Sequence, residues 1–476
     1  MVETKLFEII AAIVGSNNVS DQDFARFSYA KDWSAIPIAE GCVPSIVVMP
    51  TTKEEVVEIF RLANKEKIPI TTWGGGTGLT GGALASKGGI LIDTRRMNKV
   101  IKIDTDSMTV TTQPGITVTE LGKILGERGF MLGHSPVSNR SCTVGGNIST
   151  DGIGFWGMRF GEAGRQVVAL EVVLPTGEII RTGRNVLKSS TGYKLHWLFV
   201  GAEGTLGIIT EATLKIYPLP ETLSKNLVIL RNIETAIHVA KKMVQAGLVP
   251  HYMEIQDRDR ARTYVSKAME MGLVLEQDSK EIFAILGFGF GGTKEVVDNQ
   301  TSVALKICLE QGGKDLGAEL AEEWFQARYQ PPTPYSLIKT TLDKGKRFLT
   351  IDCSVPIENF EKLYDHFQAL VEKHGLVNSG CCLYLGGLPL VLIPSFAVYV
   401  DTQNDSEWER FERFCNDFIR TTLELGGTIT SHTGVGLRHR EFVEDELGTA
   451  LRLMKSIKRL LDPNSIMNPG KKWPQN

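Results

Sequence analysis

Short apolar runs alternate with helix-like hydrophobic spacing along the first part of the chain. The run Ser45–Met49 ends at Pro50 and predicts a strand, and Thr52 with Glu55 three residues later is typical of a capping box. The sequence that follows, EEVVEIFRLANKEK, repeats apolar residues at helical spacing. Further elements are expected as strands at 68–73, 89–93, 100–104 and 108–113, a helix at 118–128, and three strands within 165–217. The connections are too short for regular βαβ units, which indicates a mixed arrangement of strands.

The pattern changes after Pro220, where helices alternate with strands and glycine becomes rarer. This alternation is typical of an α+β domain. Glycine returns close to the C-terminus. The chain is therefore expected to divide into an N-terminal domain over 1–220, a cap domain over 221–425 and a C-terminal segment over 426–476.

Residues 381–400 form an apolar stretch without a charged side chain, long enough to cross a bilayer. Two glycines and two prolines interrupt it, and these residues disfavour a continuous helix. The pattern favours two buried strands joined by a turn, and a hairpin that touches a membrane is the alternative.

Composition excludes several classes of protein. The 476 residues contain 52 Lys and Arg and 55 Asp and Glu, for a net charge of -3, which gives no indication of a nucleic-acid partner. The seven cysteines show no spacing typical of a metal site, which argues against an iron–sulfur cluster on this chain and favours scattered thiols in a cytosolic protein. The N-terminus lacks the basic region expected of a signal peptide.

Glycine is the one skewed residue type, with 48 of 476, and the excess falls in loops. The first loop, WGGGTGLTGG from Trp73, contains GxGxxG over Gly76–Gly81. A Rossmann unit requires a helix to start within such glycines, yet a strand is expected from Gly89. A Rossmann unit is therefore rejected. We interpret the loop as an anion-binding loop, in which backbone amides without neighbouring side chains can hold an anion. A tight turn without a ligand is the alternative.

Two more small-residue stretches follow. The stretch from His134 to Gly154 is polar, and its Gly145–Gly146 pair would let backbone approach a large planar ligand closely. The third, GAEGTLGIIT from Gly201, turns directly into a strand. Three such loops separated by strands predict one long ligand threaded between them.

The segments PTTKEEVVEIFRLANKEKIPITTWGGGTGLTGG, SCTVGGNISTDGIG, LFVGAEGTLGIITEATLKIYPLP and DPNSIMNPGKKW resemble the FAD-linked oxidases. This is the fold of vanillyl-alcohol oxidase and p-cresol methylhydroxylase, and the chain looks most like the branch of glycolate oxidase D-subunits and D-lactate dehydrogenases. The resemblance implies an α+β fold in which the first and last parts of the chain form a two-part FAD-binding domain and the middle forms the cap. It also implies a set of FAD-binding residues: Gly74, Gly75, Gly76, Thr77, Gly78, Pro136, Ser138, Thr143, Gly145, Gly146, Thr150, Gly154, Glu203, Gly204, Ile208 and Asn468.

The chain departs from this branch at two motifs. Many members carry HLGDGNLH-like text in the cap, where this chain has LYLGGLPLVLIP, and GEHGIG near the C-terminus, where this chain has SHTGVG from Ser431. Neither segment keeps the His and Glu ligands, so no metal site is expected. SHTGVG is also similar to the alkylglycerone-phosphate synthases, which use FAD in a redox-neutral exchange of an acyl for an alkyl group.

His432 is the best candidate for a catalytic base, because imidazole can accept a proton near neutral pH; a histidine simply packed in a glycine turn is the alternative. Arg328 and Tyr329 resemble the family's site for the substrate carboxylate, which arginine can bind through two hydrogen bonds. Arg328 as an ordinary surface residue remains open. His439 is expected at a solvated helix start, and no residue stands out for covalent flavin attachment, so FAD is expected to be non-covalent.

The leading interpretation is an FAD-dependent dehydrogenase of a 2-hydroxy acid, such as D-lactate or glycolate, or of a related alcohol. Electrons would pass to an electron-transfer flavoprotein, an iron–sulfur subunit or a quinone. The alternatives are a redox-neutral synthase-like flavoenzyme and a flavin-carrying electron-transfer subunit with a degenerate substrate site. A cytoplasmic homo-oligomer or subunit of a complex is expected, with peripheral membrane association left open.

Overall fold

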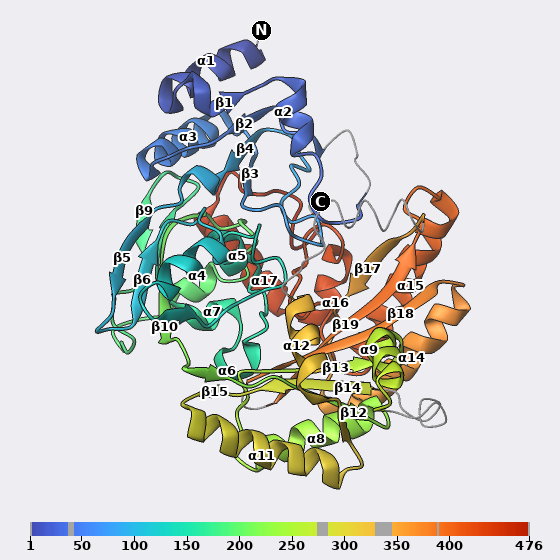
Figure 1. The fold of residues 1–476 in the computed structure, drawn as a ribbon. Helices are drawn as coiled ribbons and strands as arrows, with labels where there is room; N and C mark the ends of the chain where they lie inside the picture. The colour runs from blue at the N-terminus through green and yellow to red at the C-terminus, as the bar shows by residue number, and fades with distance from the viewer. Residues whose placement is uncertain (1, 37–41, 274–283, 329–344, 388–389, 475–476) are drawn as a thin grey trace. The chain divides into compact units, whose positions relative to one another are not determined.

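The computed structural model describes residues 2–36, 42–273, 284–328, 345–387 and 390–474, and the chain forms two compact units (Figure 1). Unit 1 contains Met1–Ile153, Glu162–Pro218 and His432–Asn476. Unit 2 contains Gly154–Gly161 and Leu219–Ser431. The assignment of 154–161 to unit 2 is a feature that the hydrophobic pattern did not indicate.

Unit 1 is built on two sheets. The four-stranded sheet has the order β1-β2-β4-β3, in which β2 and β3 both run parallel to β4. The second sheet has the order β5-β6-β10-β8-β9, with β7 also paired to β10, and its pairs are antiparallel. The strands are β1 Val19–Ser20, β2 Ile46–Val48, β3 Ile70–Trp73, β4 Ile90–Asp93, β5 Val100–Asp104, β6 Thr109–Thr112, β7 Phe130–Leu132, β8 Val167–Val173, β9 Ile179–Arg181 and β10 Ile208–Pro218.

The capping box at Thr52 is confirmed. The Thr52 side chain accepts a hydrogen bond from the Glu55 amide, and the Glu55 carboxylate accepts from the Thr52 amide, at the start of α3. One face of α3 and one of α1 bury apolar side chains in the core of the first sheet. The helices of unit 1 are α1 Val2–Val14, α2 Asp23–Ser28, α3 Lys53–Glu66, α4 Val118–Gly126, α5 Val144–Thr150, α7 Ala163–Gln166, α16 Val443–Leu447 and α17 Ala450–Leu461, with 3-10 turns η1 Ser16–Asn18, η3 Thr94–Arg96, η4 Leu195–Leu198 and η6 Arg440–Phe442.

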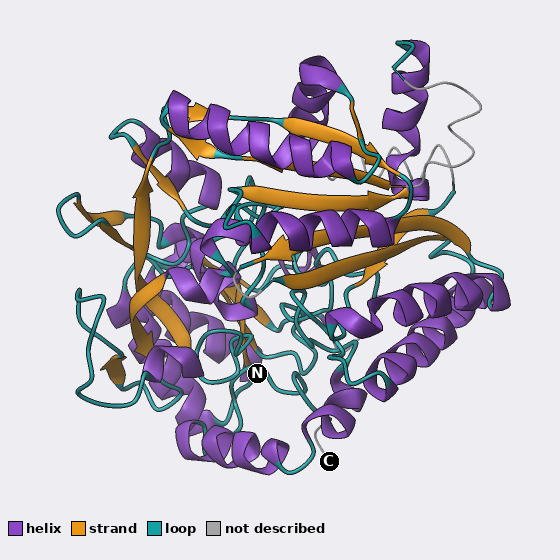
Figure 2. Ribbon diagram, turned by 90° about the horizontal axis from the view of Figure 1, so that it is seen from below, coloured by secondary structure: helices purple, strands orange, loops and turns teal. Residues whose placement is uncertain are grey.

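Unit 2 contains a seven-stranded antiparallel sheet of order β16-β12-β14-β13-β18-β19-β17, and a small pair β11–β15. Figure 2, with helices in purple and strands in orange, shows long helices lying along strand layers. The strands are β11 Thr222–Leu223, β12 Asn226–Leu230, β13 Tyr252–Asp257, β14 Ala284–Gly289, β15 Gly291–Gly292, β16 Lys314–Asp315, β17 Arg347–Ile351, β18 Val377–Gly386 and β19 Val391–Val400. The helices are α6 Gly157–Phe160, α8 Ile233–Gln245, α9 Arg258–Glu270, α11 Lys294–Glu310, α12 Gly317–Arg328, α14 Phe360–Lys373 and α15 Asp405–Glu424, with 3-10 turn η5 Ile357–Asn359.

An aromatic cluster explains why residues 154–161 belong to unit 2. The Phe155 ring stacks on Tyr252 with ring centroids 4.3 Å apart, and it also contacts Trp324 and Phe325. These side chains belong to one buried apolar cluster. Burial of a large aromatic side chain stabilises such a contact strongly.

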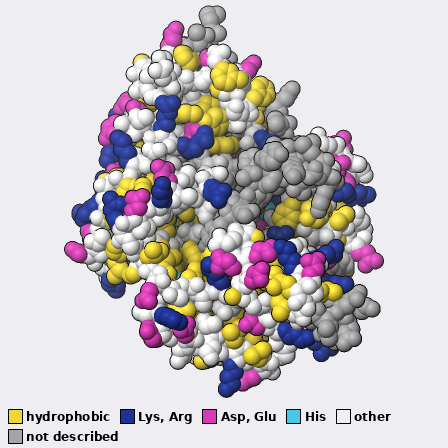
Figure 3. All heavy atoms as spheres, in the orientation of Figure 1, with side chains coloured by type: hydrophobic (Ala, Val, Ile, Leu, Met, Phe, Trp, Pro, Cys, Tyr) yellow, Lys and Arg dark blue, Asp and Glu magenta, His cyan; other side chains and the backbone are white. Residues whose placement is uncertain are grey.

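The apolar stretch 381–400 is a hairpin of two paired strands, β18 and β19, as predicted, with residues 388–389 outside the described part of the chain. Among the helices that the structure describes, none is both long and apolar enough to cross a bilayer. On the face shown in Figure 3, basic and acidic side chains are interspersed, in keeping with the small net charge.

Candidate flavin site

The first glycine loop packs directly against the second. A Cβ atom added at Gly75 would lie 2.0 Å from the Ser141 carbonyl oxygen, and one at Gly74 would lie 2.4 Å from Thr143 Oγ1. Gly76 has φ +63°, and a Cβ atom there would meet the Trp73 indole. These three positions therefore require glycine because protein atoms already fill the space.

Gly78 differs from its neighbours. A Cβ atom at this position would meet no described atom closer than Asp32 Oδ2, at 3.8 Å. The protein itself leaves room beside Gly78, so a requirement for glycine here would come from a ligand. The strand β4 follows at Ile90 with no helix in between, which confirms the rejection of a Rossmann unit.

The prediction that 134–154 is loop throughout is wrong, because α5 lies inside it. Thr143 caps this short helix: its Oγ1 accepts a hydrogen bond of 3.2 Å from the Gly146 amide. Gly145 is needed for packing, because its Cβ atom would lie 2.6 Å from Pro114 Cβ. Thr150 donates its hydroxyl proton to the Gly146 carbonyl at 2.6 Å. The Gly145–Gly146 pair therefore opens a helix instead of lying in extended loop.

Pro136 and Ser138 lie in the turn that leads to α5, where the Ser138 carbonyl accepts from the Ser141 and Cys142 amides. The Ile208 side chain is buried in the apolar core of the first sheet, where it packs against protein side chains. Gly154 belongs to unit 2, so the structure does not group it with the other predicted FAD residues.

The third loop is joined to the C-terminal part of the chain through Glu203. Its buried carboxylate accepts from the Val435 amide at 2.8 Å and the Gly436 amide at 2.7 Å, and Lys472 Nζ lies 2.9 Å away. Beside it, Gly204 has φ +68°, and a Cβ atom there would lie 2.4 Å from Thr72 Oγ1. The Glu203 carboxylate therefore binds backbone amides and a lysine of the C-terminal segment, a role that the sequence did not reveal.

Asn468 lies where the first and third loops meet. Its Nδ2 donates to the Gly82 carbonyl at 2.9 Å and to the Glu203 carbonyl at 2.6 Å. Its Oδ1 is buried and has no hydrogen-bond partner among the described residues. A buried acceptor without a partner is costly, so this oxygen is suited to receive an N–H group from a ligand.

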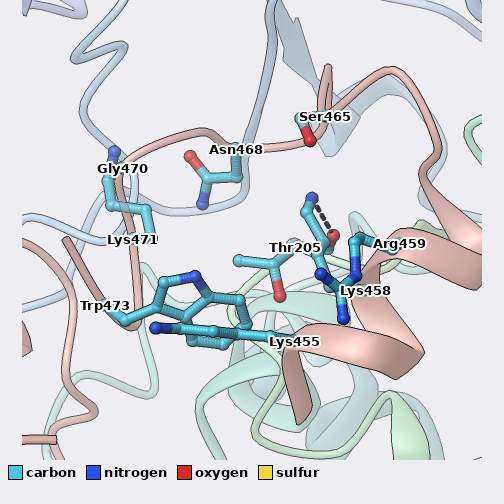
Figure 4. Close-up of a pocket in the computed structure, with 9 residues that line it drawn as sticks. All are labelled: Thr205, Lys455, Lys458, Arg459, Ser465, Asn468, Gly470, Lys471 and Trp473. Carbon is cyan, nitrogen blue, oxygen red and sulfur yellow. Dashed lines mark hydrogen bonds between the residues drawn. The ribbon is translucent and has the colours of Figure 1, made fainter. Parts of the chain in front are cut away.

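A cavity of about 200 Å³ lies beside Asn468, and Figure 4 shows the side chains around it. Its cations differ in availability. Lys458 is committed to the Thr205 and Met467 carbonyls and to Asp462, whereas Lys455 is half-buried and Arg459 is exposed. The lining residues are Thr205, Lys455, Lys458, Arg459, Ser465, Asn468, Gly470, Lys471 and Trp473. No acidic side chain is among them, so the cavity suits an anionic group.

The segment that carries His432 is anchored to the same loops. Thr80 donates its hydroxyl proton to the Thr433 carbonyl at 3.2 Å, and Glu203 holds the amides of Val435 and Gly436. His432 itself is half-buried in unit 1. Arg328 is the last residue of α12 in unit 2, and Tyr329 lies outside the described residues.

The prediction of a solvated His439 is wrong. Its side chain is buried at the start of η6, although the position before a helical turn is as expected. The sequence showed arginines on both sides, but packing within unit 1 covers the imidazole.

The chain matches two family descriptions. Residues 44–183 match "FAD binding domain", and residues 219–472 match "FAD linked oxidases, C-terminal domain". The second match alone covers more than half of the sequence. The chain belongs to the FAD-linked oxidases. The predicted family and fold class are thereby confirmed, and FAD is the cofactor of this family.

Two relatives of this FAD-linked oxidase span almost its whole length. It is 29% identical over 483 residues to glycolate oxidase subunit GlcD of Bacillus subtilis, covering 99% of this chain and 97% of that protein. It is 30% identical over 434 residues to the mitochondrial D-lactate dehydrogenase [cytochrome] 1 of Saccharomyces cerevisiae, covering 90% and 72%.

Two solved structures share the fold. One is p-cresol methylhydroxylase with substrate bound, with a TM-score of 0.83 at 21% identity over 98% of this chain and 96% of that chain. The other is an alkyldihydroxyacetonephosphate synthase, with a TM-score of 0.80 at 24% identity over 98% and 85%. The fold of this FAD-linked oxidase is therefore common to redox enzymes and to a synthase.

The residues present fit FAD on observations of the structure itself. The space beside Gly78 is open, the Asn468 Oδ1 acceptor has no partner among the described residues, and the cavity next to it is lined by cations. A dinucleotide needs close approach to backbone, partners for its ring nitrogens and charge complementarity for its phosphates.

We expect Gly78→Ala to lower the flavin content of the purified protein while leaving apoprotein stability within about 0.5 kcal/mol of wild type. Among the described residues beyond its two chain neighbours, the added methyl group meets no atom closer than 3.8 Å, so a loss of flavin would indicate a clash with the ligand. The ratio of flavin to protein absorbance and the thermal unfolding of the apoprotein measure the two effects.

Gly75→Ala is the matched comparison. Its methyl group would lie 2.0 Å from the Ser141 carbonyl oxygen. We expect it to destabilise the apoprotein by about 1–3 kcal/mol. Full flavin content in Gly78→Ala would contradict the assignment of the open space to FAD.

We expect the stability of the protein to depend on pH through the buried His134 imidazole. Burial lowers its pKa from 6.5 to about 4 in the folded protein. Because protonation then favours the unfolded chain, this contribution to stability is complete above pH 6.5 and is lost as the pH falls toward 4, by about 3 kcal/mol. His251 has a pKa lowered to about 4 as well, whereas the pKa values of the buried Asp151 and Asp257 are raised to about 6 and act in the opposite direction. His134→Gln should therefore reduce the loss of stability between pH 7 and pH 4 without abolishing it.

Thermal unfolding between pH 7 and pH 4 measures this slope. The exposed His366 supplies the control, since His366→Gln should keep the wild-type slope. An unchanged slope in His134→Gln would show that the buried imidazole does not control acid stability.

Proposed function

We propose that this FAD-linked oxidase removes two electrons from a 2-hydroxy acid, such as D-lactate or glycolate, or from a related alcohol, and passes them to a separate acceptor. One observation carries the proposal: the segment with His432 is held by Thr80 and Glu203 against the loops that fit FAD. The names of the glycolate oxidase and D-lactate dehydrogenase relatives favour the hydroxy-acid class.

In this proposal the two-part flavin domain consists of residues 1–220 and 426–476, and residues 221–425 form the cap over the substrate. Bound FAD, held without a covalent link, supplies the hydride acceptor. The Gly78 region, the Asn468 amide oxygen and the loop amides bind and orient it.

Side chains are proposed to carry out proton transfer and substrate binding. The His432 imidazole accepts the proton of the substrate hydroxyl, which is the task of a general base. Arg328 and Tyr329 bind the substrate carboxylate, for which a guanidinium is suited because it donates two parallel hydrogen bonds. Replacement of His432 by alanine tests the first of these assignments.

Substrate binding is proposed to proceed without a metal ion. The segment LYLGGLPLVLIP offers no histidine or carboxylate, and its described strand residues belong to β18 and β19. No group of three metal-ligating side chains occurs among the described residues. A carboxylate held by arginine alone is consistent with this chemistry.

The acceptor is proposed to be an electron-transfer flavoprotein, an iron–sulfur subunit or a quinone. The seven cysteines are buried and form no disulfide, so a relay cluster would be supplied by another subunit. The protein is proposed to act in the cytoplasm as a homo-oligomer or as one subunit of a complex.

A redox-neutral synthase is the second candidate. The SHTGVG segment and the fold shared with alkyldihydroxyacetonephosphate synthase favour it. It differs from the dehydrogenase in one observable: it would not leave the flavin reduced.

Anaerobic flavin absorbance, recorded against a panel of 2-hydroxy acids and alcohols, tests the proposal. Bleaching by a hydroxy acid in the presence of a chelator is the expected result. Bleaching that requires zinc or manganese would contradict binding without a metal ion. No bleaching by any member of the panel, together with acyl-to-alkyl exchange, would establish the synthase instead.

A further inference from the structure

The segment between β9 and β10 has an unusual surface. Every residue from Gly183 to Leu195 is exposed. Tyr193 is 94% exposed, Leu187 65% and Val186 60%. Three further large apolar side chains are exposed within residues 179–197, namely Ile179, Leu195 and Trp197. A concentration of this kind marks an interaction surface, since single exposed apolar residues are ordinary but groups of them are not.

All charged side chains of the same segment are positive. Residues 179–197 contain Arg181, Arg184, Lys188 and Lys194 but no Asp or Glu, in a chain whose net charge is -3. Arg181 is paired with the buried Glu171, which leaves the other three for an external partner. A partner with negative charge is therefore favoured.

The surface is presented from a fixed base. β9 pairs with β8 at the edge of its sheet in Figure 1, and the Thr182 amide donates to the Leu170 carbonyl at 2.9 Å. Thr213 on β10 donates its hydroxyl proton to Asn185 at 3.3 Å. Phe199, just past the far end, is buried in the core of the same sheet. Both ends of the segment are thus held while its middle projects into solvent.

We propose that residues 179–197 dock this protein onto the surface of an anionic phospholipid membrane. Tyrosine and tryptophan favour the headgroup level of a bilayer, and aliphatic tips such as Val186 and Leu187 can enter the acyl boundary. Lysine and arginine side chains beside them are attracted to anionic lipid. Protein interfaces are depleted in lysine, which makes an acidic protein partner the less favoured occupant. The proposal does not depend on the flavin chemistry.

Co-sedimentation of the full-length, flavin-loaded protein with vesicles tests the proposal. The vesicles are phosphatidylcholine alone, or phosphatidylcholine mixed with phosphatidylglycerol. We expect the wild type to sediment with the mixed vesicles and to be released by salt. The variant K188E/K194E should bind them more than about tenfold more weakly, and V186S/L187S/Y193S should lose binding at all salt concentrations.

Matched variants outside the segment control for a general change in surface. Phe24 and Leu460 are 78% and 79% exposed, so F24S/L460S removes two well-exposed apolar side chains outside the segment. Lys65 and Lys123 are exposed lysines, and K65E/K123E makes the same change in net charge. Both should sediment like the wild type, with unchanged flavin content.

The proposal is overturned if the wild type stays in the supernatant with mixed vesicles, or if the two segment variants sediment as the wild type does. Equal binding to neutral and anionic vesicles would also overturn the role assigned to the cations. A wild type that avoids vesicles but is retained by an acidic protein surface would identify the other occupant.

Discussion

Replacement of His432 by alanine is expected to slow substrate-dependent flavin reduction by about 10²- to 10⁴-fold, because a general base contributes on this scale. The amides of Val435 and Gly436 stay bound to Glu203 in this variant, so flavin content and unfolding temperature should not change. Anaerobic stopped-flow absorbance measures the rate directly, and the loss should appear in the maximal rate more than in substrate affinity.

His366→Ala is the control for His432→Ala, since His366 is an exposed histidine on α14 whose ring bonds only to the Lys362 carbonyl of its own helix in the described contacts. It should reduce flavin at the wild-type rate. Wild-type turnover in His432→Ala would instead favour a flavin-carrying electron-transfer subunit, and would remove the proposed base.

Local signals in the sequence were sufficient to predict two elements of the fold. The Thr52–Glu55 box depends on two side chains within one turn, and the 381–400 hairpin on prolines and glycines inside an apolar run, so neither needs distant contacts. α5 was missed because two glycines in its first turn lower helix propensity, although the Thr143 cap that offsets them was visible in the sequence.

Features that depend on distant residues could not be predicted. The burial of His439 and the attachment of 154–161 through Phe155 follow from packing that no local pattern encodes. The sequence could not show which glycines of the first loop are needed for packing, because this depends on distant residues. Gly74 and Gly75 pack against the neighbouring loop, whereas the space beside Gly78 stays open. The glycine loops could be predicted from the sequence, but the residues that pack against them could be identified only from the structure.

Removal of the Glu203 carboxylate is expected to destabilise the flavin unit strongly. In Glu203→Ala the Val435 and Gly436 amides lose their acceptor and the largely buried Lys472 ammonium loses its counter-charge. Breaking a buried pair in this way costs about 3–5 kcal/mol. Chemical denaturation of the apoprotein measures this loss, and Glu322→Gln, which breaks an exposed ion pair with Lys225, should cost about 1 kcal/mol or less.

Glu203→Gln distinguishes the effect of Glu203 on the His432 segment from its effect on the stability of the protein. The amide keeps one oxygen for the 435–436 backbone but cannot neutralise Lys472, so the protein should stay folded with the His432 segment less firmly held. Flavin reduction should then be slower at temperatures where the variant is fully native. In a double-mutant cycle with Lys472→Met, the two losses should be clearly less than additive, because either change breaks the same pair. Full additivity would mean that Glu203 and Lys472 act independently, so that their ion pair does not contribute to the stability of the flavin unit.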